Sequence, residues 1–372
     1  MAYKINNTFG TLLVTLADGT IDADLMDVEG EHSVLSVLQG ACLAGARTFT
    51  ATCGQGLAFM FEPYFRTPNL RLPIVMSLVT RDGITPQCVW GGHQDAMTVR
   101  EVGWIQMYCE NNQEILDTII MAYKIAEDKK VMLPVNVCHD GNYQSYGVEI
   151  VEVPDQGLVD KFLGEKDTNW HVALDPERPM GVDPLTGGAT GNGPALFARY
   201  RRGECNAMQN ALGVIEEVHA EFARQLGRSY SPLVEEYRLD DADYAIVTMA
   251  GMTGTGKVAV DTAREAGEKV GLIKIKTFRP FPLKAVLKAL NKIKALGVVD
   301  RSVSFGWNGG PVFQEMASAM YHMDKRIPAV DFVAGLAGAD ITLDDFSRII
   351  KTTARALKGE VPEEPIWINL ND

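Results

Sequence analysis

Three carboxylates open the stretch of sequence best suited to chemistry, because a carboxylate can accept hydrogen bonds or a proton. Asp27, Glu29 and Glu31 stand just before residues 34–46, where apolar side chains recur at helical spacing and small residues allow close packing. Acidic groups in the first turn suit the helix dipole, so ordinary helix-end charges are one interpretation. A binding or catalytic site is the other.

The segment after that helix favours a site. Residues 47–53 are rich in β-branched side chains and predict a strand, which breaks at Gly54, Gln55 and Gly56 before a second helix. Turns of this kind, from a strand into glycines, are where α/β proteins build sites. The neighbouring glycine turn therefore favours a site over ordinary helix-end charges for the acidic cluster.

Arg81 is a candidate for binding an anion. It ends residues 72–80, an apolar run that predicts a buried parallel strand, so the cation would lie at the carboxyl edge of the sheet. A surface ion pair is the alternative. His93 and Asp95 close the loop that starts at Arg81, where a histidine is more often a cap or hydrogen-bonding group than a base. Trp90, in the same loop, is either core or a pocket wall.

Residues 251–257 follow a predicted strand and match the phosphate-binding pattern G-x-x-x-x-G-K. Val258 stands where that pattern needs a serine or threonine hydroxyl for magnesium, and no clear acidic strand end supplies the other ligand. A glycine turn into a helix, whose free N–H groups could face an anion, is the alternative. A non-catalytic nucleotide-binding or scaffold module that uses the glycine loop at Gly251 is thus a second functional hypothesis.

Composition narrows the function classes. The 372 residues carry 35 basic and 48 acidic side chains, a net charge of -13, which argues against a nucleic-acid partner. No apolar run approaches membrane-spanning length, and the start lacks a signal peptide, so we expect a cytoplasmic chain without a membrane span. The six cysteines include no C-x-x-C pair, so we expect neither a metal site nor an iron–sulfur cluster in this chain.

The order of predicted elements indicates two doubly wound α/β domains, at 1–150 and 236–372, joined by an extended connection with one helix at 151–235. Asn111 is predicted to cap a helix at 113–128. The predicted strands are 47–53, 72–80, 103–109, 131–138, 244–250, 270–276, 296–299 and 330–333. The other predicted helices are 204–225, 257–266, 283–293, 312–320 and 343–357.

Several sequence blocks together resemble one known family. The blocks are EGEHS at 29–33, GARTFTAT at 45–52 with QGL at 55–57, LPIVM at 72–76, GWIQ at 103–106, ENNQE at 110–114 and TFRPFP at 277–282. They are similar, in the same order, to the α-subunit of the 2-oxoacid:ferredoxin oxidoreductases, which include pyruvate, branched-chain and aryl 2-oxoacid enzymes. The resemblance implies a thiamine-diphosphate pyrimidine-binding domain followed by a transketolase C-terminal-like domain.

The resemblance also implies roles for individual residues. Glu31 matches the glutamate that hydrogen-bonds N1′ of the aminopyrimidine, and Arg81 matches the arginine that binds the substrate carboxylate. Ile5, Gly54 and Gln55 fall at positions expected to contact the cofactor. The implied activity is oxidative decarboxylation of a 2-oxoacid, with transfer of the acyl group to coenzyme A.

Other parts of the implied enzyme must come from partner chains. Thiamine enzymes hold the pyrophosphate and Mg²⁺ with a Gly-Asp-Gly segment, and none occurs here. We therefore expect one partner subunit that holds the pyrophosphate with its Mg²⁺, and iron–sulfur subunits that accept the electrons. Family members also carry a further strand and helix before the segment that matches residues 3–8, so either the start is shortened or another chain fills that place.

The substrate is expected to be pyruvate or an aryl 2-oxoacid such as phenylglyoxylate. Asn6 stands where the pyruvate enzymes have a substrate-facing threonine, a change that keeps a hydrogen-bonding group but alters its reach. Trp90 and Phe9 could line an apolar wall. A dicarboxylate such as oxalate would need a further positive charge for its second carboxylate. No second arginine is seen near Asn6 or in the loop after Arg81, so oxalate is a less favoured substrate.

Overall fold

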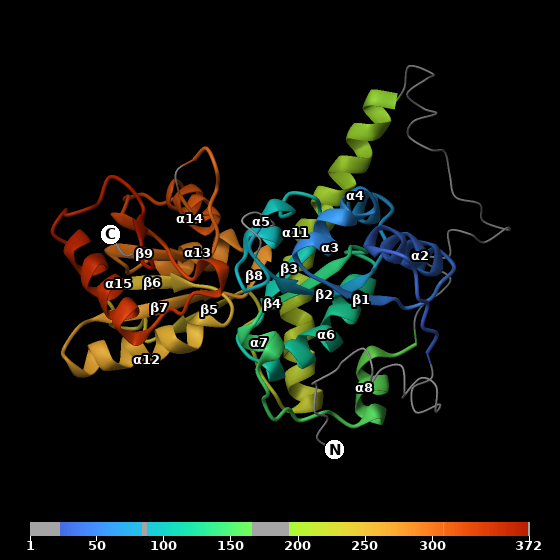
Figure 1. The fold of residues 1–372 in the computed structure, drawn as a ribbon, viewed down its shortest axis with the longest axis horizontal. Helices are drawn as coiled ribbons and strands as arrows, with labels where there is room; N and C mark the ends of the chain where they lie inside the picture. Colours follow the sequence, from blue (N-terminus) through green and yellow to red (C-terminus); the bar gives the residue numbers. More distant parts are fainter. Residues whose placement is uncertain (1–22, 84–87, 166–192, 308, 371–372) are drawn as a thin grey trace.

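The computed structural model describes residues 23–83, 88–165, 193–307 and 309–370, which form two α/β lobes side by side (Figure 1). In this part of the chain, the first lobe is built on a five-stranded sheet with strand order β1-β2-β4-β3-β8. β1 to β4 pair in parallel, whereas β8 is antiparallel to β3. The strands are β1 (Phe49–Thr52), β2 (Val75–Thr80), β3 (Ile105–Tyr108), β4 (Val135–Asp140) and β8 (Thr277–Arg279).

Helices cover both faces of the first sheet. One face, which includes Met76 and Leu78, packs with α2 (Glu31–Leu43), α3 (Gly54–Phe59), α4 (Phe61–Asn69) and α5 (Gln94–Thr98). The other face, which includes Val75 and Val135, packs with α6 (Asn112–Glu127), α8 (Gln156–Leu163) and α11 (Gly193–Leu226). Successive strand residues point to opposite faces, so the unbroken apolar runs require this double cover. The doubly wound prediction is confirmed here.

The predicted cap of α6 is also confirmed, since the side chain of Asn111 accepts a hydrogen bond from the N–H of Glu114 at 2.9 Å. α2 differs from its prediction of 34–46. It begins at Glu31 and ends at Leu43, because Gly45 adopts φ +100° and cannot continue the helix. Glu31 is therefore inside the first turn and not in the preceding loop.

The second lobe holds a six-stranded sheet, within the described residues, of order β11-β10-β9-β6-β7-β5. Its strands are β5 (Val234–Tyr237), β6 (Tyr244–Thr248), β7 (Val270–Ile275), β9 (Ala295–Asp300), β10 (Ala329–Val333) and β11 (Ile366–Trp367). All neighbours are parallel except β5 with β7. The helices of this lobe are α12 (Met252–Glu265), α13 (Leu283–Leu290), α14 (Pro311–Met320) and α15 (Leu343–Ala356), with a short 3₁₀ turn η1 (Leu336–Gly338).

The connection between the lobes differs from the prediction of one helix at 204–225. Its described part contains α8 as well as α11, which begins at Gly193. Asp155 caps α8, because its side chain accepts a hydrogen bond from the N–H of Gly157 at 2.9 Å. This start signal was missed because the region around it lacks a regular pattern of apolar residues. α7 (Tyr143–Tyr146) precedes the connection. In Figure 1 the long helix α11 runs along the first lobe, where its apolar side chains complete the core against α6.

Buried charges tie the lobes together. Lys274 and Lys276 lie in or just after β7 of the second lobe, and both reach Glu114 of α6, at 3.1 Å and 2.9 Å. Lys274 also pairs with Glu110 at 2.8 Å. Each of these ion pairs joins a lysine of the second lobe to a glutamate of the first lobe, so they hold the two lobes together. Among the described residues, no helix is both long and apolar enough to cross a membrane.

Candidate active site

Glu31 lies against the glycine turn that the sequence placed next to it. Its partly exposed side chain projects from the first turn of α2 toward Gly56 of α3. A methyl group at Gly56 would stand 2.8 Å from Oε1 of Glu31 and 2.5 Å from Oγ1 of Thr52. Both distances are shorter than a normal contact, so a glycine is needed here for the carboxylate to keep its place.

We expect Gly56→Ala to reduce ligand binding or activity that depends on Glu31 with little loss of stability. The added methyl meets Oγ1 of Thr52 and the carboxylate of Glu31, and the long Glu31 side chain is the one that can move aside, which leaves its carboxylate misplaced. Gly40→Ala in the exposed middle of α2 is the matched control, because nothing lies within 4 Å of its added carbon. The control should raise stability by about 0.5–1 kcal/mol. Melting and activity measured in parallel test the prediction; a large drop in melting temperature for Gly56→Ala alone would contradict it.

Arg81 lies on the other side of the same turn. It directly follows β2, pairs through its backbone with Gly91, and packs on Gly54, where an added Cβ would lie 3.5 Å from its Cδ. Its Nε is buried and has no hydrogen-bond partner among the described residues. A buried guanidinium N–H without a partner is costly, so the geometry fits an anion binder better than a surface ion pair.

Asp95 joins these elements and was not predicted as a site residue. Its Oδ2 accepts the N–H of Gly54 at 2.9 Å, and its own N–H donates to the carbonyl of Arg81 at 3.1 Å. Burial raises the pKa of Asp95 to about 7, against the lowering effect of its backbone hydrogen bonds. Cys53 lies among the same charges: burial raises the pKa of its thiol, Arg81 opposes this, and Asp95 and Glu31 add to it. Glu31, Arg81 and Asp95 thus surround one turn.

His93 stands at the N-cap position of α5, but its side chain makes no capping bond. Instead its Nε2 lies 2.9 Å from Oδ1 of Asp140, and Arg301 of the second lobe lies 2.6 Å from the same oxygen. The N–H of Gly251 donates to Oδ2 at 2.8 Å. Burial would raise the pKa of Asp140, but Arg301 and His93 lower it to about 2. This cluster, which we call the Asp140 cluster, joins the carboxyl ends of the two sheets.

The phosphate-loop interpretation of residues 251–257 is not supported by the geometry. Gly254 and Gly256 lie inside helix α12, so their N–H groups do not line a loop. Lys257 pairs with Glu110 at 2.9 Å and with Glu235 at 2.7 Å. A lysine neutralised by two carboxylates is poorly placed to bind a phosphate.

The remaining predicted site residues divide into two groups. Ile5, Asn6 and Phe9 lie outside the described residues. Gln55 is exposed at the start of α3, and Gly54 is buried with φ +41°. Trp90 is 47% exposed and lies against Gly338 of the second lobe, so it is at the surface near the lobe boundary and not in the core. In the described part of the chain, no group of His, Cys, Asp or Glu has the arrangement of a metal site.

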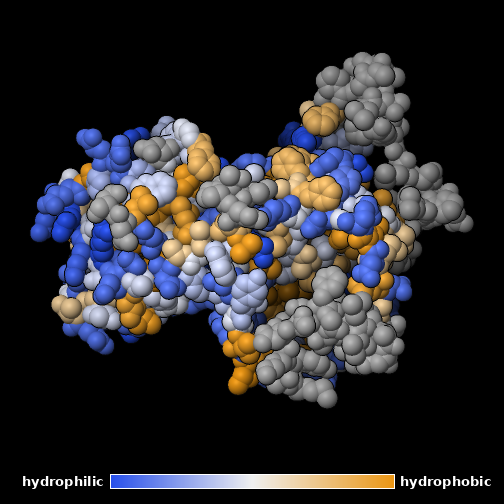
Figure 2. Space-filling view, in the orientation of Figure 1, coloured by the Kyte–Doolittle hydropathy of each residue, from blue (hydrophilic) through white to orange (hydrophobic). Residues whose placement is uncertain are grey.

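An exposed aromatic surface flanks the turn. Phe59, Phe61 and Phe65 are 60%, 42% and 39% exposed, and Phe59 lies beside His32, the neighbour of Glu31. Figure 2 shows hydrophobic residues gathered over α4 in this region. Contiguous exposed apolar surface is a feature of sites that contact another protein.

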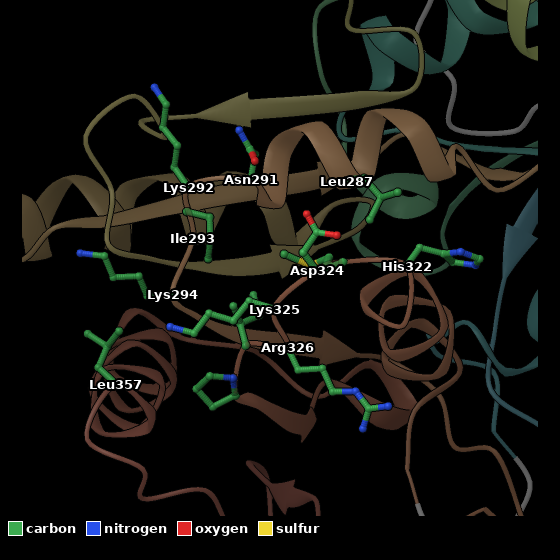
Figure 3. Close-up of a pocket in the computed structure, with 13 residues that line it drawn as sticks. Leu287, Asn291, Lys292, Ile293, Lys294, His322, Asp324, Lys325, Arg326 and Leu357 are labelled. Carbon is green, nitrogen blue, oxygen red and sulfur yellow. The ribbon is translucent and has the colours of Figure 1, made fainter.

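A cavity of about 720 Å³ lies elsewhere, at the amino ends of β9 and β10. Its cationic side chains Lys292, Lys325 and Arg326 point in different directions in Figure 3, and Lys294 pairs with Asp243 at 2.6 Å. Ligands of parallel α/β sheets bind at the carboxyl ends of the strands, which is the opposite edge. The turn between Glu31 and Arg81 is therefore the better candidate.

Comparisons with known domains and folds identify the two lobes. Residues 8–219 match the thiamine diphosphate-binding model of pyruvate flavodoxin/ferredoxin oxidoreductases, and residues 242–346 match core domain II of pyruvate:ferredoxin oxidoreductase. The fold resembles a 2-oxoglutarate:ferredoxin oxidoreductase from Magnetococcus marinus, with TM-score 0.61 and 16% identity, over 95% of this chain and 60% of that one. It also resembles a split-gene transketolase, with TM-score 0.53 and 12% identity, over 95% and 98%. The predicted fold class is confirmed.

Similar sequences give the family. The chain is 67% identical to the α-subunit of NADH-dependent phenylglyoxylate dehydrogenase of Aromatoleum evansii, over 96% of this chain and 86% of the relative. It is 43% identical to the pyruvate synthase subunit PorA of Pyrococcus abyssi, over 95% and 88%. These matches confirm the resemblance seen in the sequence: the chain belongs to the thiamine diphosphate-binding family of pyruvate flavodoxin/ferredoxin oxidoreductases, as an α-type subunit of a 2-oxoacid oxidoreductase.

Proposed function

We propose that this chain holds the aminopyrimidine half of a thiamine diphosphate site in a cytoplasmic, multi-subunit 2-oxoacid oxidoreductase. The complex converts a 2-oxoacid and coenzyme A to an acyl thioester and carbon dioxide. The two electrons released by this oxidation pass to iron–sulfur clusters in partner chains. The observation that carries this proposal is that Glu31 and Arg81 flank one turn, residues 53–56, at the carboxyl edge of the first sheet.

The residues at the turn fit the cofactor. Glu31 offers a partly exposed carboxylate, and Gly56 beside it has no side chain to obstruct a ring. When bound, thiamine diphosphate supplies the carbon nucleophile and the electron sink of the reaction. Glu31 accepts a hydrogen bond from the aminopyrimidine and stabilises positive charge on its ring nitrogen. Gly54 and Gly56 of the turn are buried, and a low-dielectric surrounding strengthens this interaction relative to water.

Arg81 orients the carboxylate of the 2-oxoacid. Its unpartnered Nε and the rest of its guanidinium form a planar fork that binds a carboxylate through two parallel hydrogen bonds. Arg81→Lys keeps the charge but loses the fork, so we expect the KM for the 2-oxoacid to rise about tenfold or more, equivalent to ~1.4 kcal/mol. Steady-state kinetics of the complex measure this. Arg66→Lys, which changes an exposed pair with Glu62 on α4, is the control and should leave KM unchanged.

We expect the purified chain to be inactive without its partners, even with thiamine diphosphate, Mg²⁺, coenzyme A and a 2-oxoacid added. The sequence has no Gly-Asp-Gly segment for the pyrophosphate and its Mg²⁺, and its cysteine spacing offers no cluster-binding run. Phe59, exposed beside His32, suits contact with the subunit that supplies these parts. Dye reduction by the chain alone is the measurement, and turnover without partners would contradict the proposal.

A phenylglyoxylate-type aryl 2-oxoacid is the favoured substrate, with pyruvate as the alternative. The higher identity to the phenylglyoxylate dehydrogenase subunit supports this order. The decisive experiment is an assay of the native complex with a panel of 2-oxoacids, coenzyme A and a viologen dye. A kcat/KM higher for phenylglyoxylate than for pyruvate supports the proposal. Absence of coenzyme-A-dependent dye reduction with every 2-oxoacid would overturn it.

A further inference from the structure

Two segments that are far apart in the sequence must keep a fixed separation if Glu31 and Arg81 act on the same ligands. Glu31 contacts α3 through Gly56, whereas Arg81 stands at the end of β2. Among the described residues, no hydrogen bond joins the side chains of Glu31 and Arg81. Their spacing therefore depends on the pairing of β1 with β2 and on the contacts that hold the glycine turn to the end of β2.

Asp95 makes that connection. Its carboxylate accepts the N–H of Gly54 at 2.9 Å, and its own N–H donates to the carbonyl of Arg81 at 3.1 Å. We propose that Asp95 is a positioning residue, which sets the distance between the cofactor-binding Glu31 and the substrate-binding Arg81 by tying Gly54 to the end of β2. This inference rests on the proposed function of Glu31 and Arg81 and goes beyond it, because it assigns a role to a third residue that contacts the segments of both.

Asp95 is itself held from several sides, as a positioning residue must be. It lies in α5, whose Ala96 carbonyl accepts a hydrogen bond from Gln106 of β3 at 2.9 Å. The neighbouring Gln94 accepts the N–H of Val303 from the second lobe at 2.9 Å. α5 is thus fixed to the sheet and to the other lobe, so the carboxylate of Asp95 forms a rigid point of attachment for the turn.

The consequence of losing this attachment follows from the geometry of Gly54. This residue is buried with φ +41°, and its N–H would be left without a partner in the buried turn if the carboxylate were removed. An unpartnered buried donor is unfavourable, so the turn would shift until the N–H found another acceptor. Because Gly56 contacts Glu31 and Gly54 contacts Arg81, such a shift would disturb both functional groups together.

Three variants of the assembled complex test the inference. Asp95→Ala removes the acceptor, whereas Asp95→Asn keeps an oxygen that can accept the N–H of Gly54. Asp155→Ala removes an equivalent carboxylate-to-backbone bond at the start of α8, away from the site, and is the matched control. The measurements are the Kd for thiamine diphosphate by calorimetry, the KM for the 2-oxoacid, and the melting temperature.

We expect Asp95→Ala to raise both the Kd for thiamine diphosphate and the KM for the 2-oxoacid by about tenfold. In Asp95→Asn both constants should stay close to their wild-type values, and Asp155→Ala should change neither. The inference would be overturned if Kd and KM of Asp95→Ala lay within twofold of wild type. It would also be overturned if Asp95→Ala and Asp95→Asn raised these constants equally. If Asp95→Ala does not assemble, Asp95→Ser, whose shorter side chain withdraws the acceptor from Gly54, is judged by the same criteria. Wild-type turnover in the same preparations tests the proposed function separately, because the comparison of Kd values among variants does not require turnover.

Discussion

Glu31→Gln is expected to lower turnover of the assembled complex by about 10²–10³-fold while leaving its fold and assembly intact. Losing one positioned interaction with a developing charge typically has an effect of this size. Glutamine keeps the volume of the side chain, which sits against Gly56 and Thr52, and can still accept one hydrogen bond. It removes the negative charge that stabilises a protonated ring nitrogen, so chemistry and not folding should respond.

Glu29→Gln is the matched control for this substitution. Glu29 lies in the same acidic stretch, is exposed, and accepts a hydrogen bond from the hydroxyl of Ser33. Removing its charge should leave turnover unchanged. If Glu31 were a helix-end charge, Glu31→Gln would instead cost about 0.3–1 kcal/mol of stability and spare catalysis. Turnover and melting temperature of both variants separate the two interpretations, and equal turnover in both would refute a catalytic role for Glu31.

The proximity of Gly54 and Arg81 followed from local patterns. β1 and β2 are continuous apolar or β-branched runs, neighbouring parallel strands end at the same edge of a sheet, and the residues after each strand therefore lie together. The glycines at 54–56 marked the turn, and the capping asparagine at 111 marked the start of α6. In each case the signal and the structure that it specifies lie within a few residues of one another.

Features that depend on distant partners could not be predicted in this way. β8 is a short strand of the second half of the chain that pairs with β3 of the first lobe, and nothing in its own sequence indicates that partner. Lys276 follows an apolar strand and would be expected at the surface, yet it is buried against Glu114. The sequence indicated only that Asp95 ends a loop. Its hydrogen-bond partners, the N–H of Gly54 and the carbonyl of Arg81, belong to other segments, so the sequence around Asp95 does not reveal them.

The Asp140 cluster leads to the prediction with the largest effect on stability. Asp140 accepts hydrogen bonds from His93 and the N–H of Gly251, forms an ion pair with Arg301, and its side chain is 1% exposed. Asp140→Asn removes the charge that neutralises a buried guanidinium, so we expect the free energy of unfolding to fall by about 3–5 kcal/mol. Denaturant unfolding at matched protein concentration measures this. Asp243→Asn, which changes an exposed pair with Lys294, should have little effect because solvent screens that pair.

The same carboxylate should give the wild-type protein an acid-sensitive component of stability. The pKa of Asp140 is lowered from 3.8 to about 2 in the folded state, because Arg301 and His93 outweigh the opposing effect of burial. A depressed pKa means that the unfolded state binds the proton first, so this contribution is fully present above pH 3.8 and is lost as the pH falls toward 2. The difference in unfolding free energy between wild type and Asp140→Asn should therefore narrow across that window. A difference that stays constant from neutral pH to pH 2 would show that the Asp140 charge does not stabilise the junction between the two lobes.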